Sequence, residues 1–65
     1  MEVFYKGRAG ALIPAAVLKD NGNDVDVMIL VDRYDRHAGE QFTARRKDLQ
    51  QLIYDSKGFT KYAPY

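Results

Sequence analysis

Two apolar runs on either side of an Asn-Gly pair form the strongest pattern in this 65-residue chain. Residues 12–18 read LIPAAVL and residues 25–31 read VDVMILV, with Asn21-Gly22 between them. An Asn-Gly pair between alternating apolar residues is a strong signal for a β-hairpin with a two-residue type I′ loop. The pattern therefore predicts two antiparallel strands that meet at Asn21-Gly22.

A two-residue loop at Asn21-Gly22 also fixes the register of this hairpin. In that register Leu18 lies opposite Val25, and one face of the hairpin is apolar along its whole length. The other face is charged near the turn and apolar far from it, as expected for a hairpin that bends into a small barrel. The predicted core face holds Leu12, Pro14, Ala16 and Leu18 on one strand and Val25, Val27, Ile29 and Val31 on the other.

Pro14 conflicts with a regular ladder in this hairpin. In the predicted register it falls at a hydrogen-bonded position, and proline has no N–H to donate. We therefore expect a break or a β-bulge near Pro14, and we expect the hairpin to bend there.

Shorter patterns surround the hairpin. Residues 2–6 (EVFYK) and 41–45 (QFTAR) alternate in polarity and predict strands, with Phe42 and Ala44 directed inward. Residues 7–10 (GRAG) predict a turn. Residues 32–40 (DRYDRHAGE) have no apolar pattern and predict an exposed loop, a kind of segment that often carries function.

Near the end of the chain the apolar residues follow a helical spacing, unlike the alternation of the earlier segments. Apolar residues 49, 52 and 53 fit one face of a helix, which predicts one or two helical turns beginning at Asp48. Residues 59–65 (FTKYAPY) predict either a last short strand or a loose tail. Together these elements predict an all-β domain over residues 1–58, a strongly bent barrel of four or five antiparallel strands with one short helical turn, followed by an aromatic tail.

The segment Tyr5-Lys6-Gly7-Arg8-Ala9-Gly10, followed by a long strand, resembles the glycine-containing opening of Src-homology-3-like barrels of the Tudor and KOW type. The stretch from Pro14-Ala15-Ala16-Val17-Leu18 through Val25-Asp26-Val27 is similar to short accessory proteins of phages and prophages. This resemblance covers about half of the chain. It implies a noncatalytic binding module whose ligands dock on aromatic and loop residues at one side of the barrel.

The amino-acid composition excludes several kinds of functional site. There is no cysteine and a single histidine, which excludes disulfides, thiolate zinc sites and cysteine nucleophiles. Lys and Arg number 10 and Asp and Glu number 9, a balance unlike that of a dedicated nucleic-acid binder. The start of the chain lacks a signal-peptide pattern, and the longest apolar run is too short to span a membrane. We expect a cytoplasmic protein without a cofactor.

One cluster of acidic residues around the single histidine suggests a catalytic site or a metal site. Asp32, Asp35 and Glu40 surround His37 in the loop, a set of residue types that suits a divalent cation or a general base. Arg33 and Arg36 interleave with these acids and neutralise them, as in an ordinary solvated loop. No nucleophile with a base and no phosphate-binding loop is present. We therefore expect no enzymatic activity and no metal site.

Aromatic residues point instead to protein binding. Five tyrosines and three phenylalanines exceed what so small a barrel buries, and exposed tyrosine and arginine are enriched at protein-binding hot spots. We expect another protein to be the partner. The expected contact residues are Arg33, Tyr34, Arg36 and His37 in the loop with Tyr62 and Tyr65 in the tail.

Two alternatives remain open. In the first, Arg33, Arg36, Arg45, Arg46 and Lys47 form a basic patch that binds nucleic acid. In the second, the chain is a self-associating structural protein whose tail completes a neighbour's sheet at the exposed edge of the first strand.

Overall fold

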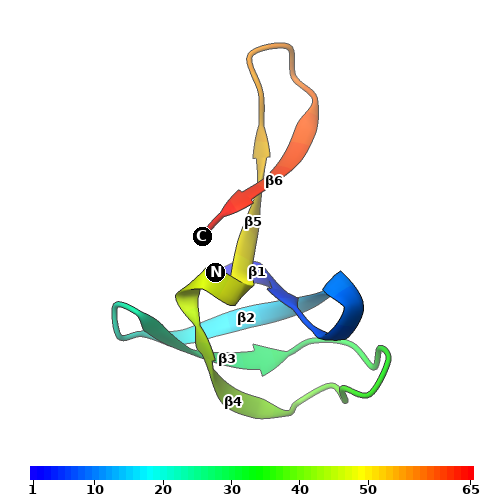
Figure 1. Ribbon diagram of the computed structural model, residues 1–65, viewed down its shortest axis with the longest axis vertical. Coiled ribbons are helices and arrows are strands. Elements are labelled where there is room, and N and C mark those ends of the chain that lie inside the picture. The colour runs from blue at the N-terminus through cyan, green and yellow to red at the C-terminus, as the bar shows by residue number, and fades with distance from the viewer.

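The structure is a computed structural model that describes residues 1–65 and consists of one antiparallel sheet of six strands (Figure 1). The strands are β1 (Glu2–Lys6), β2 (Leu12–Asp20), β3 (Asp24–Ile29), β4 (Gln41–Arg45), β5 (Leu49–Tyr54) and β6 (Thr60–Pro64). They lie in the order β4-β3-β2-β1-β5-β6, so β4 and β6 are the two edges. Two 3-10 turns, η1 (Arg8–Gly10) and η2 (Arg46–Asp48), are the only helical segments, and neither is of a length or apolarity that would cross a membrane.

One face of the sheet carries the core. The Tyr5 ring on β1 and the Phe42 ring on β4 pack edge to face on this side, with centroids 5.0 Å apart. Three strand spacings of about 4.8 Å separate β1 from β4 along the sheet, so this contact requires the sheet to curl around the core. The all-β class is confirmed, with six strands in place of four or five, and closure into a barrel is not detected. The buried residues are Val3, Ile13, Ala15, Val25, Val27, Ile29, Ala44 and Leu49.

The hairpin of β2 and β3 exists, but the predicted register is wrong. Val17 lies opposite Val27, and a bulge at Leu18 shifts the pairing before the turn, so Leu18 does not lie opposite Val25. A shift of one residue exchanges the two faces of a strand. The core face of β2 therefore holds Ile13 and Ala15, while Leu18 is 50% exposed. The predicted core face of β3 is correct from Val25 to Ile29.

The turn and the bulge together produce the shift. The turn moves the partner of Val25 from Leu18 to Asp20, two residues along β2, which keeps the faces, and the bulge then reduces the shift to one residue, which exchanges them. Asn21 N–H donates to Asp24 O, which centres the turn on Gly22 and Asn23, one residue later than predicted. Gly22 has φ +92° and Asn23 has a negative φ, which is the sign pattern of a type II′ turn. The Asp20 carboxylate accepts a hydrogen bond from Gly22 N–H and fixes this arrangement.

Pro14 ends one ladder without shifting the register of the other. Leu30 N–H donates to Pro14 O at 3.0 Å, Pro14 has no N–H to return, and β3 ends one residue before Leu30. The pairing with β1 continues through Phe4 opposite Pro14 without a shift. The expected break is therefore the end of the β2–β3 ladder. The expected bulge near Pro14 is wrong, because the bulge lies at Leu18.

The predicted helical turns after Asp48 are also wrong. The only helical residues there are those of η2, and the chain continues as β5, which pairs with β1 at Leu49 and Gln50. The tail forms β6, the strand alternative of the prediction, and pairs with β5 along its whole length. The outer part of this hairpin stands clear of the other four strands (Figure 1).

Candidate binding surfaces

The loop between β3 and β4 contains a tight turn at Tyr34 and Asp35. Arg33 N–H donates to Arg36 O and Arg36 N–H donates to Arg33 O, each at 3.0 Å, which leaves two residues in the turn. Tyr34 has φ +57°, and Asp35 does not share the positive φ. This is again the sign pattern of a type II′ turn, whose first central position normally holds glycine. Tyr34 therefore occupies a strained backbone position.

The Tyr34 side chain is 76% exposed and lies outside the core cluster. Tyr34 lines a groove of about 420 Å³ that separates this turn from η1. Across the groove stands Ala9, which has φ +58° and is the other non-glycine residue with a positive φ. The groove is lined by Arg8, Ala9, Gly10, Ala11, Ile13, Tyr34 and Asp35.

The other loop residues of the predicted protein-binding set differ in their roles. The Arg36 guanidinium lies 4.3 Å from the centre of the Phe42 ring and donates to Glu40 at 3.1 Å, so it covers the end of the core. Arg33 Nη1 donates to Leu12 O at 3.2 Å and remains exposed. His37 is exposed. Of the four loop residues, only Arg36 is committed to packing inside the chain.

The acids near His37 do not gather around it. Asp32 Oδ1 accepts a hydrogen bond from Ala38 N–H at 2.7 Å, and Glu40 pairs with Arg36. No group of three or more His, Asp or Glu side chains lies close enough to hold a metal ion. The polar groups of this loop therefore organise the loop itself.

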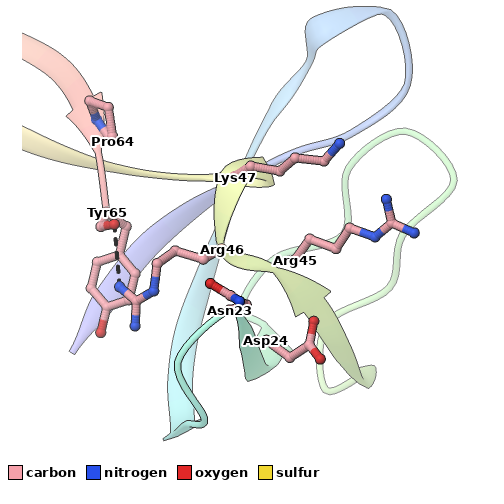
Figure 2. Close-up of a pocket in the computed structure, with 7 residues that line it drawn as sticks. All are labelled: Asn23, Asp24, Arg45, Arg46, Lys47, Pro64 and Tyr65. Atoms are coloured by element: carbon pink, nitrogen blue, oxygen red, sulfur yellow. Dashed lines mark hydrogen bonds between the residues drawn. The ribbon is translucent and has the colours of Figure 1, made fainter.

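The basic run lines a second cleft, of about 630 Å³, at the junction of η2 with the end of β6. Its lining residues are Asn23, Asp24, Arg45, Arg46, Lys47, Pro64 and Tyr65. In Figure 2 the Arg46 side chain extends toward the Tyr65 ring, while Arg45 and Lys47 extend in other directions. Arg45 and Lys47 are exposed and make no ion pair.

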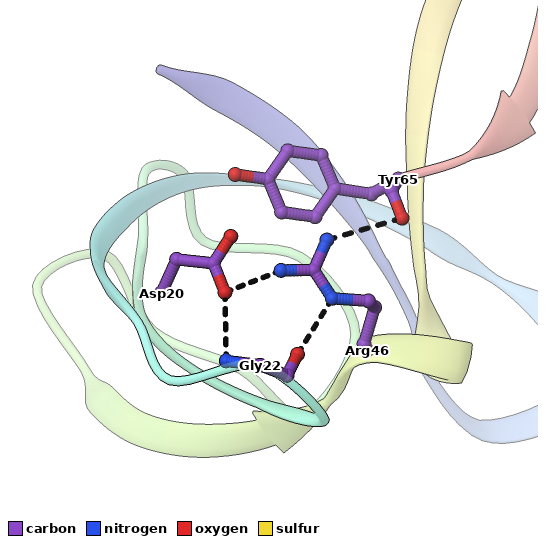
Figure 3. Close-up of polar contacts among 4 residues, drawn as sticks. All are labelled: Asp20, Gly22, Arg46 and Tyr65. Atoms are coloured by element: carbon purple, nitrogen blue, oxygen red, sulfur yellow. Dashed lines mark hydrogen bonds and ion pairs between the residues drawn. The ribbon is translucent and has the colours of Figure 1, made fainter.

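Arg46 connects three segments of the chain (Figure 3). Its guanidinium forms an ion pair with Asp20, donates from Nε to Gly22 O at 2.6 Å, and donates from Nη1 to Tyr65 O at 3.3 Å. The Tyr65 ring lies 4.8 Å from the guanidinium carbon. The hydrogen bond from Arg46 lowers the pKa of Asp20, and the same bond raises the pKa of Arg46. Arg46 and Tyr65 thus hold the β2–β3 turn to the C-terminus.

The structure does not gather the five residues of the predicted nucleic-acid patch. Arg33 and Arg36 precede β4, whereas Arg45 is its last residue, and five strand residues span about 13 Å or more. Because Arg36 and Arg46 are held by contacts inside the chain, Arg45 and Lys47 are the free cations of the run.

Tyr62 lies on neither the groove nor the cleft. Its ring packs edge to face on Phe4, with centroids 5.2 Å apart, on the face of the sheet away from the core. Three further side chains on this hairpin are strongly exposed and were missed by the sequence analysis. They are Leu52 at 47%, Tyr54 at 75% and Phe59 at 68%. The assignment of residues 49–54 to a helix concealed the alignment of Leu52 and Tyr54 along β5.

Comparison with known proteins adds no relative, because no family model, curated protein or solved structure matches this chain.

Proposed function

We propose that this chain is a noncatalytic module that binds a segment of another protein in the groove beside Tyr34. The observation that carries this proposal is the backbone of Tyr34. A non-glycine residue with positive φ costs about 1–3 kcal/mol, and such strain clusters at binding sites. A ring that is 76% exposed gains little from packing in return. The contact that offsets the strain is therefore made with a partner.

A second turn in the same chain supports this argument. The β2–β3 turn has the same φ sign pattern and holds Gly22 at the corresponding position, where glycine carries no steric cost. The Arg33–Arg36 turn holds Tyr34 there instead. Since folding alone favours glycine at both positions, the tyrosine is best explained by recognition.

The lining of the groove indicates the kind of segment that fits. Ala9, Ala11 and the buried Ile13 offer a narrow apolar floor, with the Tyr34 ring at one side. Arg8 and Asp35 add one charge of each sign. An extended segment with a small apolar side chain between polar groups matches this lining, and the expected similarity to Src-homology-3-like modules agrees with peptide docking between loops.

A library of random peptides displayed on yeast and panned against the purified chain tests the proposal. We expect enrichment of peptides whose binding weakens about tenfold or more in Tyr34→Gly, because a central tyrosine anchor typically contributes that much. Tyr54→Ser is the matched control, since Tyr54 is equally exposed at 75% but lies on the β5–β6 hairpin, and it should bind normally. Failure to enrich any peptide, or equal binding to Tyr34→Gly, would reject the proposal.

Nucleic-acid binding is a second candidate, favoured by the cleft that places Arg45 and Lys47 beside Tyr65. Two free cations and an aromatic ring suit a phosphate and a stacked base. An amide-resolved NMR titration with a short DNA duplex and a short RNA tests it. Salt-sensitive shifts at these three residues, absent in the double variant Arg45→Gln/Lys47→Gln, would support this candidate. An absence of shifts at low salt would remove it.

A further inference from the structure

The outer part of the β5–β6 hairpin has only two strands. β1 pairs with β5 at Leu49 and Gln50 and no further, so residues 51–54 have β6 on one side and no strand on the other. An isolated two-stranded hairpin is marginally stable in water. This part of the chain therefore gains stability from any further strand that pairs with it.

Large apolar side chains gather on this same segment. Leu52, Tyr54, Phe59 and Tyr62 are between 47% and 75% exposed. With about 150–250 Å² for a whole aromatic side chain, they offer roughly 450 Å² of mostly apolar surface. Of these four residues Tyr62 lies on β6 itself, so its ring is the one that a strand paired beside β6 covers.

The hydrogen-bonding groups of β6 show which edge is open. Tyr65 N–H donates to Leu49 O and Asp55 N–H donates to Phe59 O, so the hydrogen-bonded pairs between β5 and β6 fall on odd-numbered residues. The N–H and C=O groups of Thr60 and Tyr62 therefore point away from β5. They form an unpaired strand edge, which is a template for another strand.

We propose that a second copy of this chain pairs with this edge, β6 against β6 in antiparallel orientation, with Tyr62 on the two-fold axis. In this register the two copies of Tyr62 exchange hydrogen bonds, and Thr60 N–H of each copy donates to Pro64 O of the other. Pro64 O also accepts from Gln51 Nε2 of its own chain at 2.9 Å, and a carbonyl oxygen has a second lone pair for the bond from Thr60. The N–H that Pro64 lacks is not needed for these four bonds. The two Tyr62 rings lie side by side on one face, as an aromatic cross-strand pair.

Charge selects this register over its neighbour. Moving the axis to Lys61 also gives four hydrogen bonds, but it places the two lysines directly opposite each other in a non-hydrogen-bonded pair, where side chains are closest. With Tyr62 on the axis, Lys61 faces Ala63 instead. The first strand, whose edge the sequence analysis expected to be open, lies between β2 and β5 and cannot take this role. The interface is separate from the groove at Tyr34, so the two proposals stand or fall independently.

Sedimentation equilibrium from micromolar to millimolar concentration tests the dimer. We expect a reversible increase to twice the 7.4 kDa mass of the chain. Thr60→Pro removes the outward N–H without removing a hydrogen bond between β5 and β6, and it should raise the dissociation constant about tenfold or more, because each copy loses an interface hydrogen bond. Thr60→Val keeps that N–H and should dimerise normally. A monomer at every concentration, or a dimer equally stable in Thr60→Pro, would overturn the proposal.

Amide hydrogen exchange on the unmodified chain provides a test that needs no variant. The amides of Thr60 and Tyr62 should exchange slowly at high protein concentration and quickly at low concentration, because only the dimer engages them. Amides that bond within one chain, such as Tyr65 N–H, should show less dependence on concentration. Exchange at Thr60 and Tyr62 that is fast at every concentration would contradict the proposed edge pairing.

Discussion

Arg46 and Asp20 form an ion pair that joins the turn between β2 and β3 to the segment that enters β5. The two residues are far apart in sequence, and each makes further contacts at this point. Asp20 accepts the Gly22 N–H at 2.9 Å, and Arg46 donates to Gly22 O at 2.6 Å. The pair therefore fixes both the shape of the turn and its position against the rest of the chain.

Replacing Arg46 by lysine should destabilise the fold even though the charge is kept. A lysine ammonium cannot reach Asp20, Gly22 O and Tyr65 O together, because it lacks the planar fork of the guanidinium. We expect a thermal midpoint lower by several degrees in Arg46→Lys, and none of this loss in Arg45→Lys, whose side chain makes no ion pair. Equal midpoints for the two variants would contradict the role given to Arg46.

The folded state should lose stability in acid because the Asp20 carboxylate becomes protonated. Its pKa is lowered in the folded state, mainly by the hydrogen bond from Arg46 and then by that from Gly22 N–H. A carboxyl with a lowered pKa contributes stability above its unfolded pKa of about 4, and this contribution is lost as the pH falls through the folded value. Urea unfolding of the wild type should therefore show a steeper loss below about pH 4 than unfolding of Asp20→Asn. Asp24→Asn, at a carboxyl without an ion pair, should follow the wild type.

The register of β2 predicts which of its apolar residues matter. Ile13 is 1% exposed, so Ile13→Ala should cost about 2–5 kcal/mol of unfolding free energy through the cavity it leaves. Leu18 lies at the bulge and is half exposed, so Leu18→Ala should change stability by about 0.5 kcal/mol or less. Chemical denaturation measures both variants. The reverse order of effects would support the register in which Leu18 faces Val25.

The regular strands could be predicted from sequence because their alternation is local. Residues 2–6 and 41–45 and the core face of β3 follow directly from it. The register of β2 could not, since it depends on the bulge at Leu18 and on the turn at Gly22, and that turn is held by Arg46 from a distant segment. Strand β5 was assigned to a helix because three apolar residues in so short a segment fit either period.

The candidate site was partly predictable for a similar reason. Tyr34 could be found as an aromatic residue in a polar loop. Its positive φ and its position across a groove from Ala9 depend on the folded backbone, and no sequence signal reports them. Arg36 and Arg46 were interpreted as contact residues, but each lies against an aromatic ring of its own chain. Sequence does not reveal which cations a fold uses internally.

The most direct measurement compares the unfolding free energies of Tyr34→Gly and Ala9→Gly with that of the wild type. Glycine relieves a positive-φ cost of about 1–2 kcal/mol and loses about 0.5–1 kcal/mol of chain entropy, so each variant should be more stable by up to about 1.5 kcal/mol. Equal gains would show that the Tyr34 ring contributes nothing to folding, as a residue kept for a partner requires. A gain for Ala9→Gly together with a loss for Tyr34→Gly would show that the ring stabilises the fold, and would contradict the account.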